Sequence, residues 1–210
     1  MRDLLVLVPD ADIEQAMKGL LVRTRSIDIA PMDFEIRRHV NRDSGCRTNA
    51  ANFLRPYSRT YRRALVVFDR HGCGSRGTRE EIQEEVEIEL TRNGWEGRSK
   101  AIVIDPELEV WVWSRSPIVA EVLGWDTDFE ALRRWLESED LWALHRHKPQ
   151  DPKDAMRRAM EEARLPKKAR RSSSKFHDLA ATVDFTDCDD PAFVDLTRTL
   201  RAWFPPEAER

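Results

Sequence analysis

Short apolar runs alternate along the first half of the chain with segments in which apolar residues recur every three or four positions. Residues 4–8 form a continuous apolar run that predicts a buried strand. The turn Pro9-Asp10-Ala11-Asp12 offers an aspartate to cap a helix over about residues 12–23. Two short alternating pieces, residues 27–29 and 34–36, favour a second strand region that is half exposed.

The middle of the chain holds the most apolar run, residues 64–68, which is typical of a strand covered on both faces. It ends at Asp69, and a glycine-rich turn leads to Thr78 and Glu81, the pattern of a capping box for a helix that Asn93 and Gly94 close. Residues 101–104 predict the next buried strand, and the Val-Trp-Val-Trp alternation over 110–113 continues the β-rich pattern. Residues 37–63 are polar with little periodicity, so we expect a long loop there.

The last third of the chain is predicted to be helical, over about residues 129–136, 152–164, 175–181 and 191–203. Strands that alternate with helices favour an α/β fold, with a mostly parallel sheet flanked by helices on both faces. We therefore expect an α/β core over residues 1–125 and a helical C-terminal extension, residues 126–210, packed on that core.

Composition narrows the class of protein. The chain has 210 residues, about one domain's worth, and 40% of them are hydrophobic, which excludes disorder of the whole chain. Its three cysteines make no disulfide framework, as expected in a reducing cytoplasm. No apolar run approaches the roughly 18 residues of a membrane span, so we expect a cytoplasmic protein with no membrane contact.

The net charge of −3 argues against a nucleic-acid partner until it is divided by segment. Residues 35–63 carry eight arginines against two acidic residues, and residues 145–175 carry eleven lysines and arginines against four. The rest of the chain is correspondingly acidic. Such charge runs are most often solvated surface, but in the first segment the arginines are interleaved with Phe53, Tyr57 and Tyr61, the combination that binds nucleic acid. The candidate nucleic-acid-binding residues are Arg47, Arg55, Arg59, Arg62 and Arg63, and an acidic protein face is the alternative partner.

Carboxylates follow the predicted strands at the edge where ligands bind in α/β sheets. Asp69 ends the most apolar strand, Glu14 lies in the first turn after strand one, and Glu107 and Glu109 follow the strand over 101–104. Together they would suit one or two Mg²⁺ ions and phosphodiester chemistry. Each also has a structural explanation: Glu14 as a favourable acid in a first helical turn, Asp69 as a turn cap, and Glu109 as a solvent-facing strand residue.

The order of these acidic residues resembles the TOPRIM-like families associated with bacterial anti-phage defence. More narrowly, the segments Val67-Phe68-Asp69-Arg70-His71-Gly72-Cys73-Gly74, Ile104-Asp105-Pro106-Glu107-Leu108-Glu109-Val110-Trp111-Val112-Trp113 and Asp190-Pro191-Ala192-Phe193 resemble an uncharacterised component of the methylation-associated defence system. The similarity covers nearly the whole chain, and its middle segment is the most specific.

The resemblance implies a TOPRIM-like core with a Mg²⁺ cofactor, nuclease activity, and other defence proteins as partners, an ATPase among them. The family's glutamate maps onto Glu14 and the first aspartate of its Asp-x-Asp pair onto Asp69, but His71 stands at the second aspartate position. Histidine is a poorer Mg²⁺ ligand than a carboxylate. Glu107 or Glu109 then replaces the missing carboxylate and His71 acts as a neighbour of the metal or a proton donor. The alternative is a catalytically inactive adaptor that binds nucleic acid or a partner subunit.

Overall fold

A computed structural model describes residues 1–114, 116–125, 128–185 and 188–206. Its centre is a four-stranded, all-parallel sheet in the order β2-β1-β3-β4. The α/β prediction with a parallel sheet flanked by helices is therefore confirmed. The strands are β1 (Arg2–Val8), β2 (Phe34–Arg38), β3 (Tyr61–Asp69) and β4 (Ser99–Ile104).

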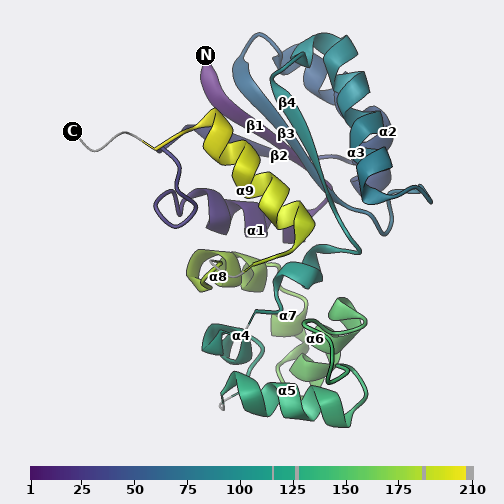
Figure 1. Ribbon diagram of the computed structural model, residues 1–210, viewed down its shortest axis with the longest axis vertical. Coiled ribbons are helices and arrows are strands. Elements are labelled where there is room, and N and C mark those ends of the chain that lie inside the picture. The colour runs from purple at the N-terminus through teal and green to yellow at the C-terminus, as the bar shows by residue number, and fades with distance from the viewer. Residues whose placement is uncertain (115, 126–127, 186–187, 207–210) are drawn as a thin grey trace.

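Helices cover both faces of the sheet, which explains why β1 and β3 are apolar on both of their sides. The helix α1 (Ala11–Leu21) packs against one face, and α2 (Arg42–Leu54) and α3 (Arg79–Leu90) lie on the other (Figure 1). The predicted helix caps are confirmed at Asp10, which caps α1, and at Thr78 and Glu81, which form a capping box for α3.

Three predictions about local structure are wrong. Residues 37–63 are not a long loop, because α2 and a 3-10 turn (Arg55–Tyr57) follow β2; α2 buries small residues such as Cys46 and Ala50, so its apolar periodicity is weak. Residues 27–29 form turns rather than a strand. The Val-Trp-Val-Trp alternation is not a strand either, because a 3-10 helix (Leu108–Trp111) bends the chain there.

The C-terminal part of the chain both forms a separate group of helices and returns to the sheet. Figure 1 shows the sheet and its helices above, with four helices beyond the carboxyl ends of the strands: α4 (Pro117–Val122), α5 (Phe129–Ser138), α6 (Pro152–Glu162) and α7 (Lys167–Arg170). The last two helices, α8 (Ser174–Thr182) and α9 (Pro191–Trp203), pack on α1 and on β4 respectively. In the described part of the chain, no helix is long and apolar enough to cross a membrane.

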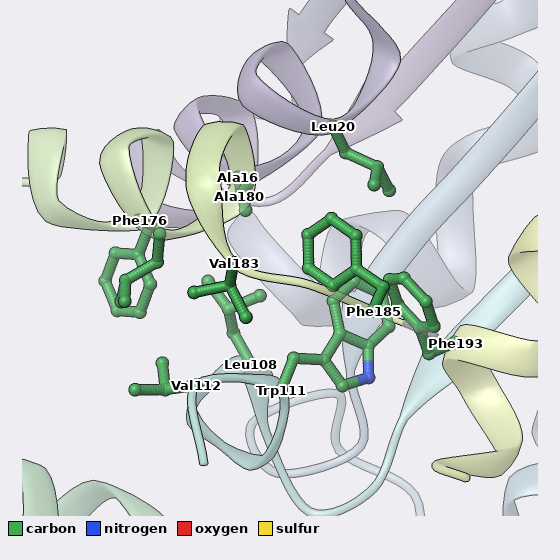
Figure 2. Close-up of a pocket in the computed structure, with 11 residues that line it drawn as sticks. Ala16, Leu20, Leu108, Trp111, Val112, Phe176, Ala180, Val183, Phe185 and Phe193 are labelled. Atoms are coloured by element: carbon green, nitrogen blue, oxygen red, sulfur yellow. The ribbon is translucent and has the colours of Figure 1, made fainter. Parts of the chain in front are cut away.

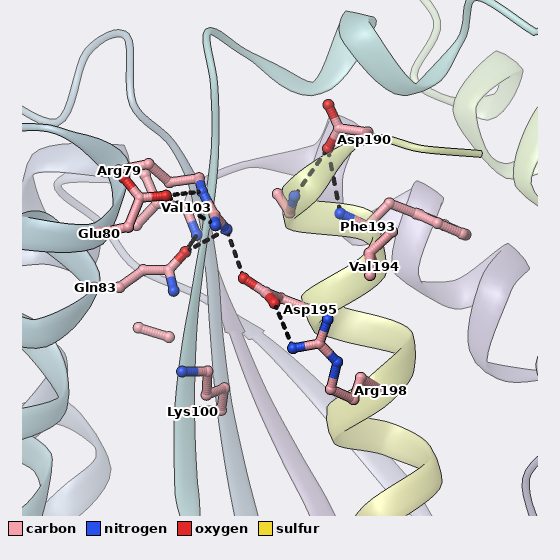
Figure 3. A network of polar contacts seen from close by, with 12 residues as sticks. Arg79, Glu80, Gln83, Lys100, Val103, Asp190, Phe193, Val194, Asp195 and Arg198 are labelled. Carbon is pink, nitrogen blue, oxygen red and sulfur yellow. Dashed lines mark hydrogen bonds and ion pairs between the residues drawn. The ribbon is translucent and has the colours of Figure 1, made fainter.

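A polar network holds α9 beside the edge strand β4 (Figure 3). The Arg79 guanidinium on α3 donates to Asp195 of α9 at 2.7 Å and to Gln83 at 2.9 Å. Gln83 in turn accepts a hydrogen bond from the backbone N–H of Val103 at 3.4 Å. The outward edge of β4 is thereby covered by side chains, which removes a template for pairing with another chain.

The 3-10 helix after β4 is held by apolar packing from three directions. Leu108 and Trp111 face α1, α8 and α9 around a small apolar cavity of about 40 Å³ (Figure 2). The Trp111 ring lies 5.4 Å from the Phe193 ring, and its Nε1 donates to Asp190 at 2.9 Å. This packing fixes the backbone that carries Glu107 and Glu109, which lie beside these anchored residues.

Candidate active site at the carboxyl edge of the sheet

Five carboxylates gather at the carboxyl edge of the sheet, and we call them the carboxylate cluster. They come from four connections: Asp10 after β1, Asp43 in the first turn of α2, Asp69 at the end of β3, and Glu107 and Glu109 after β4. Parallel strands bring these segments together because they all end at one edge. The negative charges of the other four all act on Asp69, which places Asp69 at the centre of the cluster.

Asp69 is the least satisfied member of the cluster. Its Oδ1 is buried and has no hydrogen-bond partner among the described residues. Burial raises the pKa of its carboxyl well above the usual 3.8, and repulsion by Asp43 and Glu109 raises it further. A buried acceptor without a partner is costly, and a buried charge without one costs more. Asp69 is therefore arranged to meet a cation or proton from outside the protein.

The neighbours of Asp69 are held in place by the backbone. The Asp43 Oδ1 accepts a hydrogen bond from the backbone N–H of Asp69 at 2.9 Å, which ties the start of α2 to the end of β3. Asp10 accepts from the N–H groups of Asp12 and Ile13 at 3.0 and 3.2 Å as the cap of α1. Burial raises the pKa values of Asp43 and Glu109 as well.

One ammonium group, from the helical extension, compensates part of this negative charge. The Lys153 Nζ of α6 lies 2.7 Å from Glu107 Oε2 and 3.8 Å from Glu109 Oε1. Burial acts to lower its pKa, but the hydrogen bond to Glu107 and the attraction of Glu109 outweigh burial and raise the pKa. The first turn of α6 is fixed by the Asp151 cap and by a 3.0 Å hydrogen bond from Trp113 Nε1 to the Pro152 carbonyl.

The structure brings three of the four sequence candidates for a metal site together: Asp69, Glu107 and Glu109. Glu14 lies one turn further along α1, and its carboxylate pairs with Lys18 at 2.6 Å and with Arg38 at 3.1 Å. Asp10, rather than Glu14, is the acidic residue next to the end of β1.

His71 is exposed in the turn after β3. Its backbone N–H donates to the Pro106 carbonyl at 2.9 Å, so the loops after β3 and β4 are tied together beside the cluster. The structure thus places the backbone of His71 beside the loop that carries Glu107, with the residue exposed to solvent.

Sequence reasoning missed three members of this site. Asp10 lies in the turn interpreted only as the source of a helix cap, although it follows the end of strand one by two residues, and that signal could have found it. Asp43 lay in the segment interpreted as a loop. Lys153 is 46 positions from Glu107 in the chain, and no local pattern joins them.

The ligand chemistry of the cluster suits a hard divalent cation, which prefers carboxylate oxygens. Among the described residues, no group of three His, Cys, Asp or Glu side chains is arranged to hold a metal ion. Mg²⁺ is usually bound by one or two carboxylates, with waters and substrate phosphates completing the shell. Asp69, with its free Oδ1, and the adjoining Asp43 fit that form of site.

Of the five arginines predicted to bind nucleic acid, only Arg47 lies near this edge, where it contacts the turn after β3. Arg47 is used within the fold: it pairs with Glu85 at 2.8 Å and donates to the Cys73 carbonyl at 2.9 Å. Arg63 is the third residue of β3, and at roughly 3.3 Å per strand residue it lies about 20 Å from Asp69. Arg63 therefore lies toward the opposite edge of the sheet, where the parallel strands begin, which we call the amino edge. The remaining three arginines lie at or near the amino edge: Arg55, Arg59 and Arg62.

Two hollows flank the carboxylate cluster, and basic residues line both. The first, of about 760 Å³, includes Asp10, Asp12, Arg37, Arg38, Arg42 and Arg171. The second, of about 480 Å³, includes Glu107, Glu109, Lys153, Arg170, Arg171 and Lys175. Arg171 and Asp12 line both hollows, so the two adjoin where the α7–α8 segment passes the start of α1.

Cations around buried carboxylates are the usual surroundings of a site that handles phosphate groups. We compared the chain with protein-family models, with curated proteins and with solved structures, and none of the three comparisons found a match.

Proposed function

We propose that this protein is a Mg²⁺-dependent nuclease whose active centre is the carboxylate cluster. The observation that carries the proposal is the Asp69 carboxylate, which is surrounded by four further carboxylates and has a buried Oδ1 without a partner in the described structure. A buried polar atom without a protein partner is explained by an ordered water, an ion, strain or a catalytic role, and the four surrounding carboxylates favour a cation at Asp69. The resemblance to TOPRIM-like defence proteins supports the same assignment and adds a role in anti-phage defence.

Each residue of the site would have a separate role in phosphodiester hydrolysis. A bound Mg²⁺ neutralises phosphate charge and lowers the pKa of a bound water. Asp69 would hold the cation, and Asp43 fixes the backbone of Asp69 while offering its second oxygen. Lys153 lies where its ammonium can pass from Glu107 to a phosphate oxygen, because that side chain is more than half exposed.

A catalytically inactive adaptor is the second candidate. The observation that favours it is His71, which stands where the TOPRIM pattern has a second aspartate and whose side chain is exposed. In an adaptor the cationic hollows would still bind nucleic acid or a partner subunit, while metal chemistry would be lost.

A cleavage assay decides between the two. Purified protein, alone and with an ATPase of the kind that the family resemblance implies as a partner, is incubated with plasmid DNA, single-stranded DNA and RNA in Mg²⁺, in Mn²⁺ and in EDTA. We expect cleavage that requires the metal and falls by at least about 100-fold in Asp69→Asn, because a metal ligand is removed. The matched control is Glu89→Gln, an exposed carboxylate on α3 that pairs with Arg92.

Two results would contradict the nuclease proposal. Metal-dependent cleavage that persists in Asp69→Asn would show that the activity belongs to another site or to a contaminant. A wild-type chain that cleaves none of these substrates, in either form and with either metal, would favour the adaptor.

A further inference from the structure

The first hollow carries an excess of positive charge beside the carboxylate cluster. Four arginines line it against two aspartates, and they come from separate parts of the chain: Arg37, Arg38 and Arg42 from the core, and Arg171 from the helical extension. Convergence of guanidinium groups on one hollow is a common way of binding phosphate, because each group donates two parallel hydrogen bonds.

Arg37 and Arg38 pair with Glu35 and Glu14 within the core, but two of the four arginines also have an unsatisfied donor or a strained backbone. The Nε of Arg37 is buried without a hydrogen-bond partner in the described structure, while its guanidinium lies 4.8 Å from the Tyr57 ring centre. Arg42 has a backbone φ of 50°, in the left-handed region that residues other than glycine seldom adopt. Strain and unpaired donors of this kind concentrate at binding sites.

The extension positions the fourth arginine. The Lys175 Nζ donates to the carbonyl oxygens of Arg170 at 3.2 Å and of Ser172 at 2.8 Å, which fixes the backbone on both sides of Arg171. Arg171 is exposed and lines the hollow, so a ligand in the hollow can reach it. The hollow is therefore a cleft between two structural parts, with cations on each wall.

An aromatic surface lies in the same hollow. Phe53 of α2 lines it, and its ring is 5.4 Å from the ring of His39 at the end of β2. Arginines beside an accessible aromatic ring are the combination that binds unpaired bases and their phosphates. The volume, about 760 Å³, is in the range of pockets that hold one small ligand, roughly 300–1,000 Å³, which suits one or two nucleotides.

We propose that the first hollow binds single-stranded nucleic acid, with Arg42 and Arg171 on opposite sides of the phosphate backbone and Phe53 beside a base. The inference rests on the proposed function in one respect: the hollow adjoins Asp10, so a strand bound there leads its next phosphate to the carboxylate cluster. The helical extension is then a substrate-binding element rather than only a packing partner of the core.

Fluorescence anisotropy tests this without cleavage. Labelled single-stranded DNA, single-stranded RNA and duplex DNA of about 12 nucleotides, within the usual range of single-strand site sizes, are titrated with Asp69→Asn protein in EDTA. Adding Arg42→Gln and Arg171→Gln together should weaken single-strand binding at least tenfold. The slope of log K against log salt should fall in magnitude by about 1.4, or 0.7 for each lost phosphate contact.

Two further variants separate this hollow from other basic surfaces. Arg198→Gln removes an exposed arginine on α9, away from the cleft, and should leave binding and salt slope unchanged. Arg55→Gln with Arg59→Gln removes arginines near the amino edge of the sheet, the competing site. Thermal melts of each variant confirm that it is folded.

The outcomes are distinct from those of the cleavage assay. Loss of binding confined to the Arg42 and Arg171 variant supports the hollow even if the wild-type chain never cleaves. Three results would overturn the inference, even where metal-dependent cleavage is present. Binding could be lost in the Arg55 and Arg59 variant instead, or it could be unchanged in both double variants. Duplex DNA could also bind as tightly as single strands. The DNA and RNA arms show which single strand is preferred.

Discussion

The substitution Asp69→Asn should stabilise the metal-free protein while it destroys the proposed centre. It keeps the size of the side chain and removes an ionisable group whose charged form is disfavoured by burial and by four neighbouring carboxylates. Asparagine also brings an N–H₂ group that can donate to Asp43 or Glu109. A residue that improves stability when it is neutralised is characteristic of a site kept for function rather than for folding.

The magnitude follows from the raised pKa of Asp69. Because the carboxyl ionises less readily in the folded protein than in the unfolded chain, the folded state loses stability as pH rises from about 3.8 to its raised pKa. The loss is about 1.4 kcal/mol for each pH unit in that window. For a chain of this size, about 1 kcal/mol corresponds to roughly 2–4 °C in Tm, so Asp69→Asn should gain about 3–6 °C over wild type per pH unit.

Melting curves in EDTA at pH 5, 6 and 7 test this, with Glu89→Gln as the matched control. We expect the Tm difference between Asp69→Asn and wild type to be positive and to grow with pH, while Glu89→Gln follows wild type. Saturating Mg²⁺ should narrow the gap, because a ligand at 100 times its Kd stabilises the folded state by about 2.7 kcal/mol. The reasoning would be refuted if Asp69→Asn melted below wild type at every pH. A Tm difference between the two proteins that does not change with pH would refute it as well.

Three further predictions concern how the site is held. Gly19→Ala should destabilise the protein by about 1–3 kcal/mol in urea unfolding, because its Cβ would lie 2.5 Å from the His177 carbonyl oxygen where α1 crosses α8; an unchanged midpoint would contradict this packing. Asp195→Ala should cost about 1–3 kcal/mol in the same assay by leaving the half-buried Arg79 without its 2.7 Å partner, and a neutral result would show that the α9 network is dispensable. Lys153→Met should lower Tm in EDTA, because Glu107 and Glu109 lose their ammonium partner, and Mn²⁺ should restore Tm by supplying positive charge to the cluster; a Tm that does not respond to Mn²⁺ would argue against cation binding beside these two carboxylates.

The sheet was predictable because its strands and caps are local signals. The apolar runs of β1 and β3 are too continuous for amphipathic helices, and the capping box at Thr78 is a pattern of four residues. Asp69 and Glu107 could be assigned to one edge because parallel strands end together. The parallel direction of the strands was therefore enough to place these two side chains at the same edge of the sheet.

The helix α2, the 3-10 helix and the role of Lys153 could not be predicted, because they depend on tertiary contacts that no local sequence pattern encodes. The helix α2 was missed because it packs with small residues such as Gly45, whose Cβ would lie 2.0 Å from His39 Nδ1, and small residues leave no apolar stripe. The segment around the 3-10 helix at Trp111 has the alternation of a strand because its tryptophans pack on different elements: Trp111 on Phe193 of α9 and Trp113 on Trp142. Lys153 joins the cluster through tertiary structure only.

Metal binding itself is the most direct test of the proposed active centre. Isothermal titration calorimetry of Mn²⁺ into wild type, Asp69→Asn and Glu89→Gln measures it without any substrate. We predict binding to wild type and to Glu89→Gln with equal affinity, and binding at least about 100-fold weaker in Asp69→Asn, because Mn²⁺ prefers the same oxygen ligands as Mg²⁺. Equal binding by Asp69→Asn and wild type, or no binding by wild type, would contradict a cation site at the carboxylate cluster.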